Sequence, residues 1–65
     1  MTPQEFIISE LGNITFRIET NLSTLRGRIA RNELSLYYNQ PLIDSLFDDV
    51  EKLKYLKKKL EIWTP

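Results

Sequence analysis

Three carboxylates in this 65-residue chain are spaced closely enough to suggest acid–base or metal chemistry. Asp44, Asp48 and Asp49 could act as a paired acid and base, or as oxygen ligands of magnesium. No glycine-rich phosphate loop accompanies them. Acidic side chains at the start of a helix also have a simpler role, because they face the positive end of the helix dipole. We therefore interpret the three aspartates as a solvated helix start and not as a catalytic site.

Composition excludes most other chemistry. The chain has no cysteine and no histidine. A disulfide, an ordinary zinc site and the usual nucleophile–base pairs therefore cannot form. We expect a protein that is not an enzyme and that uses no cofactor and no metal.

The arginines are the candidates for contact with nucleic acid. Arg17, Arg28 and Arg31 would lie near one another on a helix, and such a stripe could contact phosphates. The chain carries nine basic and nine acidic residues, however, whereas a nucleic-acid-binding protein normally has a basic excess. A transcriptional regulator that binds nucleic acid through this arginine face is therefore an alternative to our preferred hypothesis.

Aromatic residues offer the best candidates for a protein interface. Tyrosine and tryptophan are enriched at interaction hot spots because they bury a large area and keep a polar group. Two adjacent tyrosines occur in the central segment ELSLYYNQPL, and a tryptophan occurs near the C-terminus. These residues could instead cover the ends of a helical core. We predict partner contacts at Leu36, Tyr37, Tyr38 and Trp63.

The first half of the chain is typical of one long helix. Thr2, Pro3 and Glu5 form a capping-box pattern that predicts a helix over residues 3–31. Gly12-Asn13 could break this helix into two, which would give a three-helix bundle. The apolar positions recur every eleven residues, which predicts a nearly straight stripe with little supercoil. This stripe is a candidate core or dimer interface: Ile7, Leu11, Ile14, Ile18, Leu22, Leu25 and Ile29.

The second half predicts a helix over residues 41–63. Pro41 suits the first turn of a helix, so residues 35–40 are expected to form the connector. The apolar positions of this segment recur with a seven-residue spacing, which resembles a coiled-coil seam. They complete the candidate core or dimer interface: Leu46, Val50, Leu53, Leu56 and Leu60.

Together these segments predict an all-α fold, a two-helix αα-hairpin that forms a single domain over residues 1–65. A lone hairpin covers only one side of each apolar stripe. Face-to-face pairing of two hairpins would bury the rest, so we expect a homodimer, a four-helix bundle.

Function is predicted only at the level of class. The sequence has no segment that resembles a membrane span or a signal peptide, so we expect a cytoplasmic protein without membrane contact. We predict a small non-catalytic module that binds and modulates a larger protein, as an accessory or regulatory protein of phage or bacterial type. A structural or assembly subunit is a further alternative.

Overall fold

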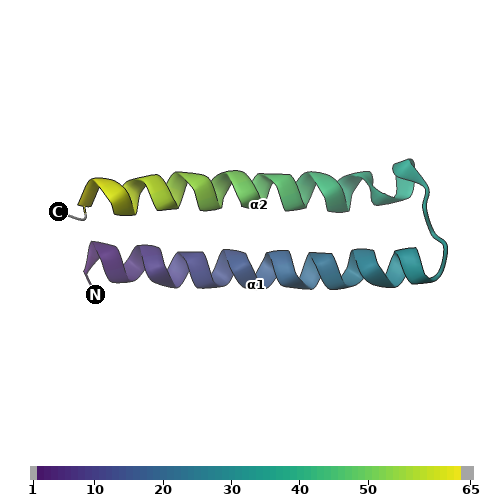
Figure 1. Cartoon of the computed structure of the whole chain (residues 1–65), viewed down its shortest axis with the longest axis horizontal. Helices are drawn as coiled ribbons and strands as arrows, with labels where there is room; N and C mark the ends of the chain where they lie inside the picture. Colours follow the sequence, from purple (N-terminus) through teal and green to yellow (C-terminus); the bar gives the residue numbers. More distant parts are fainter. Residues whose placement is uncertain (1, 64–65) are drawn as a thin grey trace.

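The computed structural model describes residues 2–63, except for the side chain of Trp63. Helix α1 spans Pro3–Ala30 and helix α2 spans Leu36–Trp63. The two helices run antiparallel and side by side over their whole length (Figure 1), within a body of 48 × 16 × 14 Å. The described residues include no strand. The prediction of an all-α hairpin is confirmed.

The start of α1 follows the predicted capping box. Thr2 has extended backbone angles, and its hydroxyl oxygen accepts a hydrogen bond from the Glu5 amide at 3.1 Å. The same hydroxyl donates to the Glu5 carboxylate at 3.1 Å. Pro3 occupies the first turn, where its missing N–H removes no helical hydrogen bond.

Helix α1 continues through Gly12 and Asn13, so the three-helix alternative is wrong. A glycine inside a helix costs about 1 kcal/mol relative to alanine. The packing of α1 against α2 on both sides of Gly12 offsets this cost. The apolar residues keep one helical phase across the glycine, as a continuous helix requires.

Helix α1 ends at Ala30, one position before the predicted end, and a residue with left-handed backbone angles follows it. Asn32 has a φ of 60°. Its amide donates to the Ile29 carbonyl at 3.0 Å, and the Glu33 amide donates to the Arg28 carbonyl at 2.8 Å. These two bonds form a Schellman motif, which satisfies carbonyls at the helix end and turns the chain toward α2.

Helix α2 begins at Leu36, so the prediction of a connector over residues 35–40 is wrong. Ser35 acts as the N-cap: its hydroxyl oxygen accepts from the Tyr38 amide at 3.4 Å, and its carbonyl accepts from the Asn39 amide at 3.1 Å. Pro41 lies inside the helix. It stands in the second turn, and its missing N–H removes only the hydrogen bond to the carbonyl of Tyr37 in the first turn. The cap at Ser35 fixes the start of the helix upstream of the proline.

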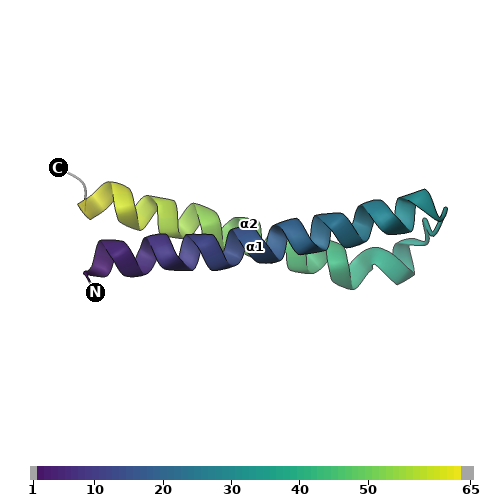
Figure 2. The same cartoon turned by 90° about the horizontal axis from the view of Figure 1, so that it is seen from below.

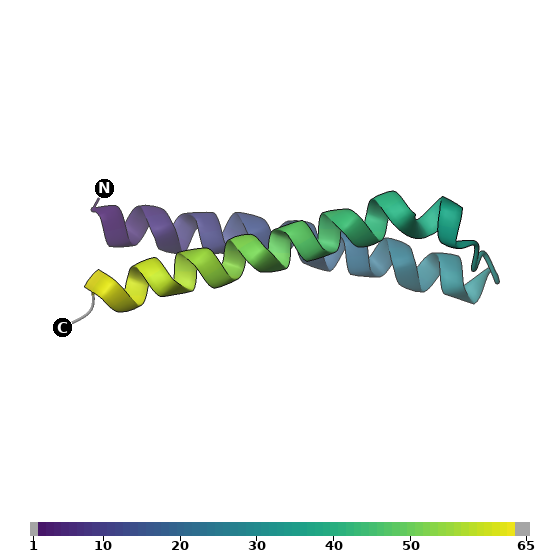
Figure 3. The same cartoon turned by 90° about the horizontal axis from the view of Figure 1, so that it is seen from above.

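The seam between the helices follows a seven-residue repeat in both elements. On α1 the buried Ile7 and Ile14 are continued by the half-buried Asn21 and Arg28, whereas Leu22 is 39% exposed. Five residues of the expected eleven-residue stripe are therefore buried or half-buried, whereas Leu22 and Ile29 fall outside the seam. A seven-residue repeat requires the helices to wrap around each other, and they cross near their middle (Figures 2 and 3).

The apolar core between the helices is thin. Ile7 and Ile14 are the only buried apolar residues among those described, at 4% and 3% exposure. On α2 the most buried described residues are polar, namely Asn39 and Asp49. Of the other predicted core residues, Leu22 and Ile29 are exposed. The rest are half-buried: Leu11, Ile18, Leu25, Leu46, Val50, Leu53, Leu56 and Leu60.

Candidate partner-binding surfaces

The hairpin has two unlike broad faces, one polar and one apolar. Contacts between the helices identify the polar face. Arg17 of α1 bonds to Asp49 of α2, and the Asn21 amide donates to the Ser45 hydroxyl at 3.5 Å. Each bond joins a flanking residue, Arg17 or Ser45, to a seam residue of the other helix, so both bonds lie on the same side of the seam. Because each helix has two flanks, the residues on the opposite flanks of α1 and α2 share the other face.

Six apolar side chains lie on this opposite face, together with the exposed Thr15 between Ile8 and Leu22. On α1, Ile8, Leu22 and Ile29 recur at multiples of seven, and they are 60%, 39% and 55% exposed. On α2, Ile43 and Val50 are half-buried, and Phe47 between them is 67% exposed. We call these six residues the apolar face. A broad exposed apolar surface of this kind marks an interaction site.

An ion pair anchors the middle of the polar face. The Arg17 Nη2 atom lies 3.0 Å from the Asp49 Oδ1 atom. The hydrogen bond from Arg17 to Asp49, together with the attraction between their charges, raises the pKa of the Arg17 guanidinium. The other carboxylate oxygen of Asp49 is buried and accepts no hydrogen bond from any described residue.

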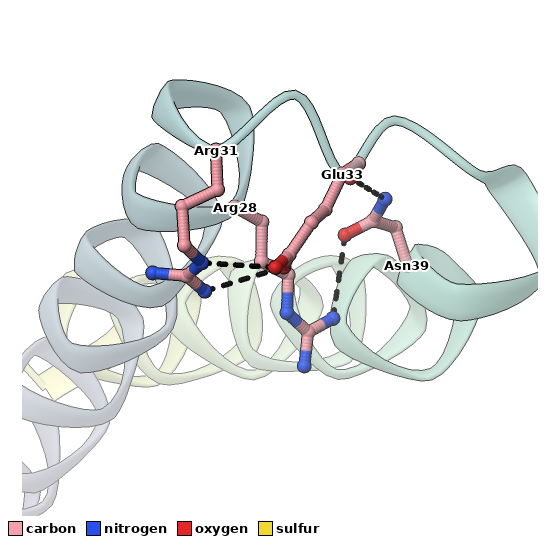
Figure 4. Close-up of polar contacts among 4 residues, drawn as sticks. All are labelled: Arg28, Arg31, Glu33 and Asn39. Carbon is pink, nitrogen blue, oxygen red and sulfur yellow. Dashed lines mark hydrogen bonds and ion pairs between the residues drawn. The ribbon is translucent and has the colours of Figure 1, made fainter.

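A polar cluster of Arg28, Arg31, Glu33 and Asn39 holds the hairpin tip (Figure 4). The buried Asn39 amide donates to the Glu33 carbonyl at 3.0 Å and to the Ser35 carbonyl at 2.8 Å. Its Oδ1 atom accepts from Arg28 at 3.3 Å. Arg31 donates twice to the Glu33 carboxylate, at 2.9 and 3.3 Å. This tip cluster joins the end of α1 to the start of α2.

The two adjacent tyrosines differ in their contacts with the tip cluster and in their exposure. Arg28 donates to the Tyr38 carbonyl at 3.2 Å, and its guanidinium lies 4.1 Å from the centre of the Tyr38 ring. This cation–π contact holds Tyr38, which is 49% exposed. Tyr37 is 93% exposed. Tyr37 is therefore the tyrosine that is presented to solvent.

A hollow of about 580 Å³ lies beside Tyr37 at the start of α2. It is lined by Tyr37, Tyr38, Gln40, Pro41 and Asp44. Gln40 donates to Asp44 at 2.8 Å, which holds the carboxylate at this surface. These five residues recur at helical spacings of three and four, so they share one side of α2. The sequence prediction missed three of them because it placed the helix start at Pro41 and left the tyrosines on a connector.

The predicted partner-binding residues do not all meet at one site. Tyr37 and Tyr38 line the hollow, whereas Leu36 is 67% exposed but does not line it. Trp63 belongs to the last turn of α2, at the opposite end from the tip, and its side chain lies outside the described residues. The tip and the C-terminal end of the hairpin are therefore separate surfaces (Figure 1).

Each arginine of the predicted nucleic-acid face already contacts the protein itself. Arg17 pairs with Asp49, Arg31 pairs with Glu33, and Arg28 bonds to Asn39 and covers the Tyr38 ring. The structure thus assigns these side chains to holding the helices and the tip together. They do not form a row of unpaired cations.

Residues 2–63 contain no group of three or more acidic side chains placed to hold a metal ion. Neither α1 nor α2 is long and apolar enough to cross a membrane. Comparison with known proteins gave no matching family, no matching curated protein and no matching solved structure.

Proposed function

We propose that this protein is a non-catalytic protein–protein interaction module that works as a homodimer and binds a larger protein. The observation that carries the proposal is the apolar face of the hairpin. Four of its six side chains are exposed and two are half-buried, while only two described apolar residues are buried between the helices. A second copy with the same face would cover these residues and complete a four-helix bundle.

The small size of the chain supports the dimer. A domain of about this length is near the limit at which its own core can stabilise it, and small chains commonly rely on disulfides, metals or oligomerisation. No disulfide can form here, because the chain lacks cysteine. If pairing removed about 1,000 Å² of apolar surface from water, the gain would be on the order of 25 kcal/mol before entropy is subtracted.

Contact with the larger protein is assigned to the hairpin tip. Tyr37 remains 93% exposed, although a large aromatic ring gains much by burial. It lies on the outer side of α2, away from the apolar face, so pairing of two hairpins leaves it free. The module would thus bind itself through one surface and its partner through another.

Molar mass in solution tests the dimer. We expect light scattering after size exclusion to give twice the chain mass of 7.7 kDa. The double variant Leu22→Glu/Ile29→Glu places charges on the apolar face, and we expect it to lose the dimer. Phe16→Glu is the matched control, since Phe16 is also exposed on α1 but lies off the apolar face.

Three outcomes would count against the proposal. A wild-type chain with full helical circular dichroism at monomer mass would overturn the dimer. Equal disruption by Phe16→Glu would show that the apolar face is not the contact. A mass well above that of a dimer would instead support the alternative of an assembly subunit.

A further inference from the structure

We propose that the hollow beside Tyr37 binds a lysine or arginine side chain of the partner protein. This inference rests on the proposed interaction function and names the chemistry of its contact. The cation would lie against the Asp44 carboxylate, and the aliphatic part of the side chain would lie on the rings of Tyr37 and Pro41.

The tyrosines of this chain show the chemistry directly. Arg28 lies 4.1 Å from the centre of the Tyr38 ring, and Lys59 lies 4.9 Å from the centre of the Tyr55 ring. Each of these two partly exposed rings is thus covered by a cation of the chain itself. Tyr37 is the most exposed of the three and has no such contact with a described residue. Its ring is therefore free to receive a cation from another molecule.

The charge of the hollow favours a cation. Its lining contains one carboxylate, that of Asp44, and no basic side chain. Asp44 accepts a hydrogen bond from Gln40 but takes part in none of the ion pairs between described residues. Arg28 lies over the Tyr38 ring but does not line the hollow. An incoming cation would therefore meet an unpaired carboxylate at the hollow itself.

The backbone adds a second acceptor. Pro41 has no amide N–H, so it cannot donate to the carbonyl of Tyr37, four residues earlier in the helix. This carbonyl lacks its usual helical donor on the first turn of α2, within the segment that lines the hollow. Lysine and arginine offer several N–H donors on one group, so one side chain could serve both the carbonyl and the carboxylate.

The size of the hollow fits a side chain together with its neighbours. At about 580 Å³ it is larger than one basic side chain, so residues on either side of the cation would also contact its walls. Such a segment would have to be exposed on the partner, because the hollow is shallow and open along the outer side of α2. The partner chemistry is therefore an exposed basic residue in a peptide segment.

A peptide titration followed by NMR tests this proposal on the full chain. The probes are acetylated and amidated Ala-Arg-Ala and Ala-Lys-Ala, with Ala-norleucine-Ala as the uncharged control. We expect saturable shifts at Tyr37, Gln40 and Asp44 with at least one basic peptide and none with norleucine. The two basic peptides distinguish an arginine from a lysine preference.

Two charge-neutralising variants locate the site. Asp44→Asn keeps the shape and the oxygen acceptor, and we expect it to weaken binding roughly threefold to tenfold. Asp48→Asn is the matched control, because it removes the same charge from the same helix outside the hollow. Tyr37→Leu removes the π system and should weaken binding roughly threefold. Circular dichroism of each variant confirms that the helices remain.

The results separate this proposal from the proposed function. Absence of saturable shifts, equal shifts with norleucine, or equal loss in Asp44→Asn and Asp48→Asn would overturn the basic-residue site. The dimer would be unaffected by any of these results, since its test is the molar mass. Conversely, a monomeric chain that binds the basic peptides at Tyr37 would keep this site and overturn the dimer.

Discussion

Arg17 and Asp49 join the two helices near their middle, with 3.0 Å between Nη2 and Oδ1. The pair is asymmetric: the Arg17 side chain is 52% exposed, whereas that of Asp49 is only 5% exposed. A buried carboxylate is costly unless its charge and hydrogen-bonding capacity are satisfied. Here one oxygen is paired and the other accepts no bond from a described residue. The pair can form at only one alignment of the helices, so it favours the observed register at a cost in stability.

Replacement of Asp49 by leucine should stabilise the protein. Asp49→Leu removes a buried carboxylate from a seam position, and an apolar side chain there would extend the thin core. We expect the free energy of unfolding to rise by about 1–3 kcal/mol. Urea unfolding at a fixed protein concentration measures the change. NMR spectra of the variant should also show broader lines, because the contact that distinguishes the native register is lost.

Arg17→Ala is the informative counterpart, because it leaves the Asp49 charge buried and unpaired. We expect this variant to be less stable than the wild type, the opposite of Asp49→Leu. The double variant Arg17→Ala/Asp49→Leu should recover most of the loss. If Asp49→Leu were instead as destabilising as Arg17→Ala, the ion pair would contribute more to stability than its burial costs.

The ion pair between Arg31 and Glu33 in the tip cluster should make the stability of the folded protein depend on pH. The hydrogen bonds from Arg31, and to a smaller degree its charge, hold the pKa of Glu33 below its ordinary value of 4.5, while partial burial opposes them. A group whose pKa is lowered by folding stabilises the folded state above its ordinary pKa. That stability is lost as the pH falls through the lower, folded value. We expect Glu33→Gln to lower the melting temperature at neutral pH.

The pH series then provides the control for Glu33. The difference in melting temperature between wild type and Glu33→Gln should shrink as the pH is lowered below about 4.5, because the wild-type carboxylate becomes protonated. Raised salt should also reduce the difference, since the pair is exposed. A difference that stays constant down to strongly acidic pH would show that Glu33 acts through its shape and not through its charge.

The hairpin and the helix N-terminus could be predicted from sequence because the signals are local. The Thr2 cap and Pro3 specify the start of α1 without reference to the rest of the chain. The seam could not be predicted in full, since Leu22 and Ile29 look like its natural continuation. The structure places Asn21 and Arg28 in the seam instead, where each donates a hydrogen bond to a polar side chain of α2. An apolar pattern alone cannot reveal which polar residues find partners across the seam.

The candidate site was predicted only in part, for a related reason. Tyr37 and Tyr38 were recognised by residue type, but their neighbours Gln40, Pro41 and Asp44 line the hollow only because α2 begins at Leu36. A proline in a sequence normally indicates the first turn of a helix. Here the Ser35 cap and the bonds of Asn39 to the tip override that preference. These are contacts between the helix start and the preceding turn, which a helix-boundary pattern does not contain.

Pro41 lies in the interior of α2, and its replacement should stabilise the helix. Pro41→Ala restores an N–H that can donate to the Tyr37 carbonyl and removes the steric conflict of the ring with that turn. The more flexible unfolded chain offsets part of this gain. We expect the free energy of unfolding to rise by about 1–2 kcal/mol, measured by urea unfolding at fixed protein concentration.

Pro3→Ala is the matched control, because Pro3 occupies the first turn of α1 and removes no helical hydrogen bond. This substitution should leave the free energy of unfolding unchanged or lower it. If Pro41→Ala were the less stable variant, the proline would be fixing the start of α2 and not interrupting it.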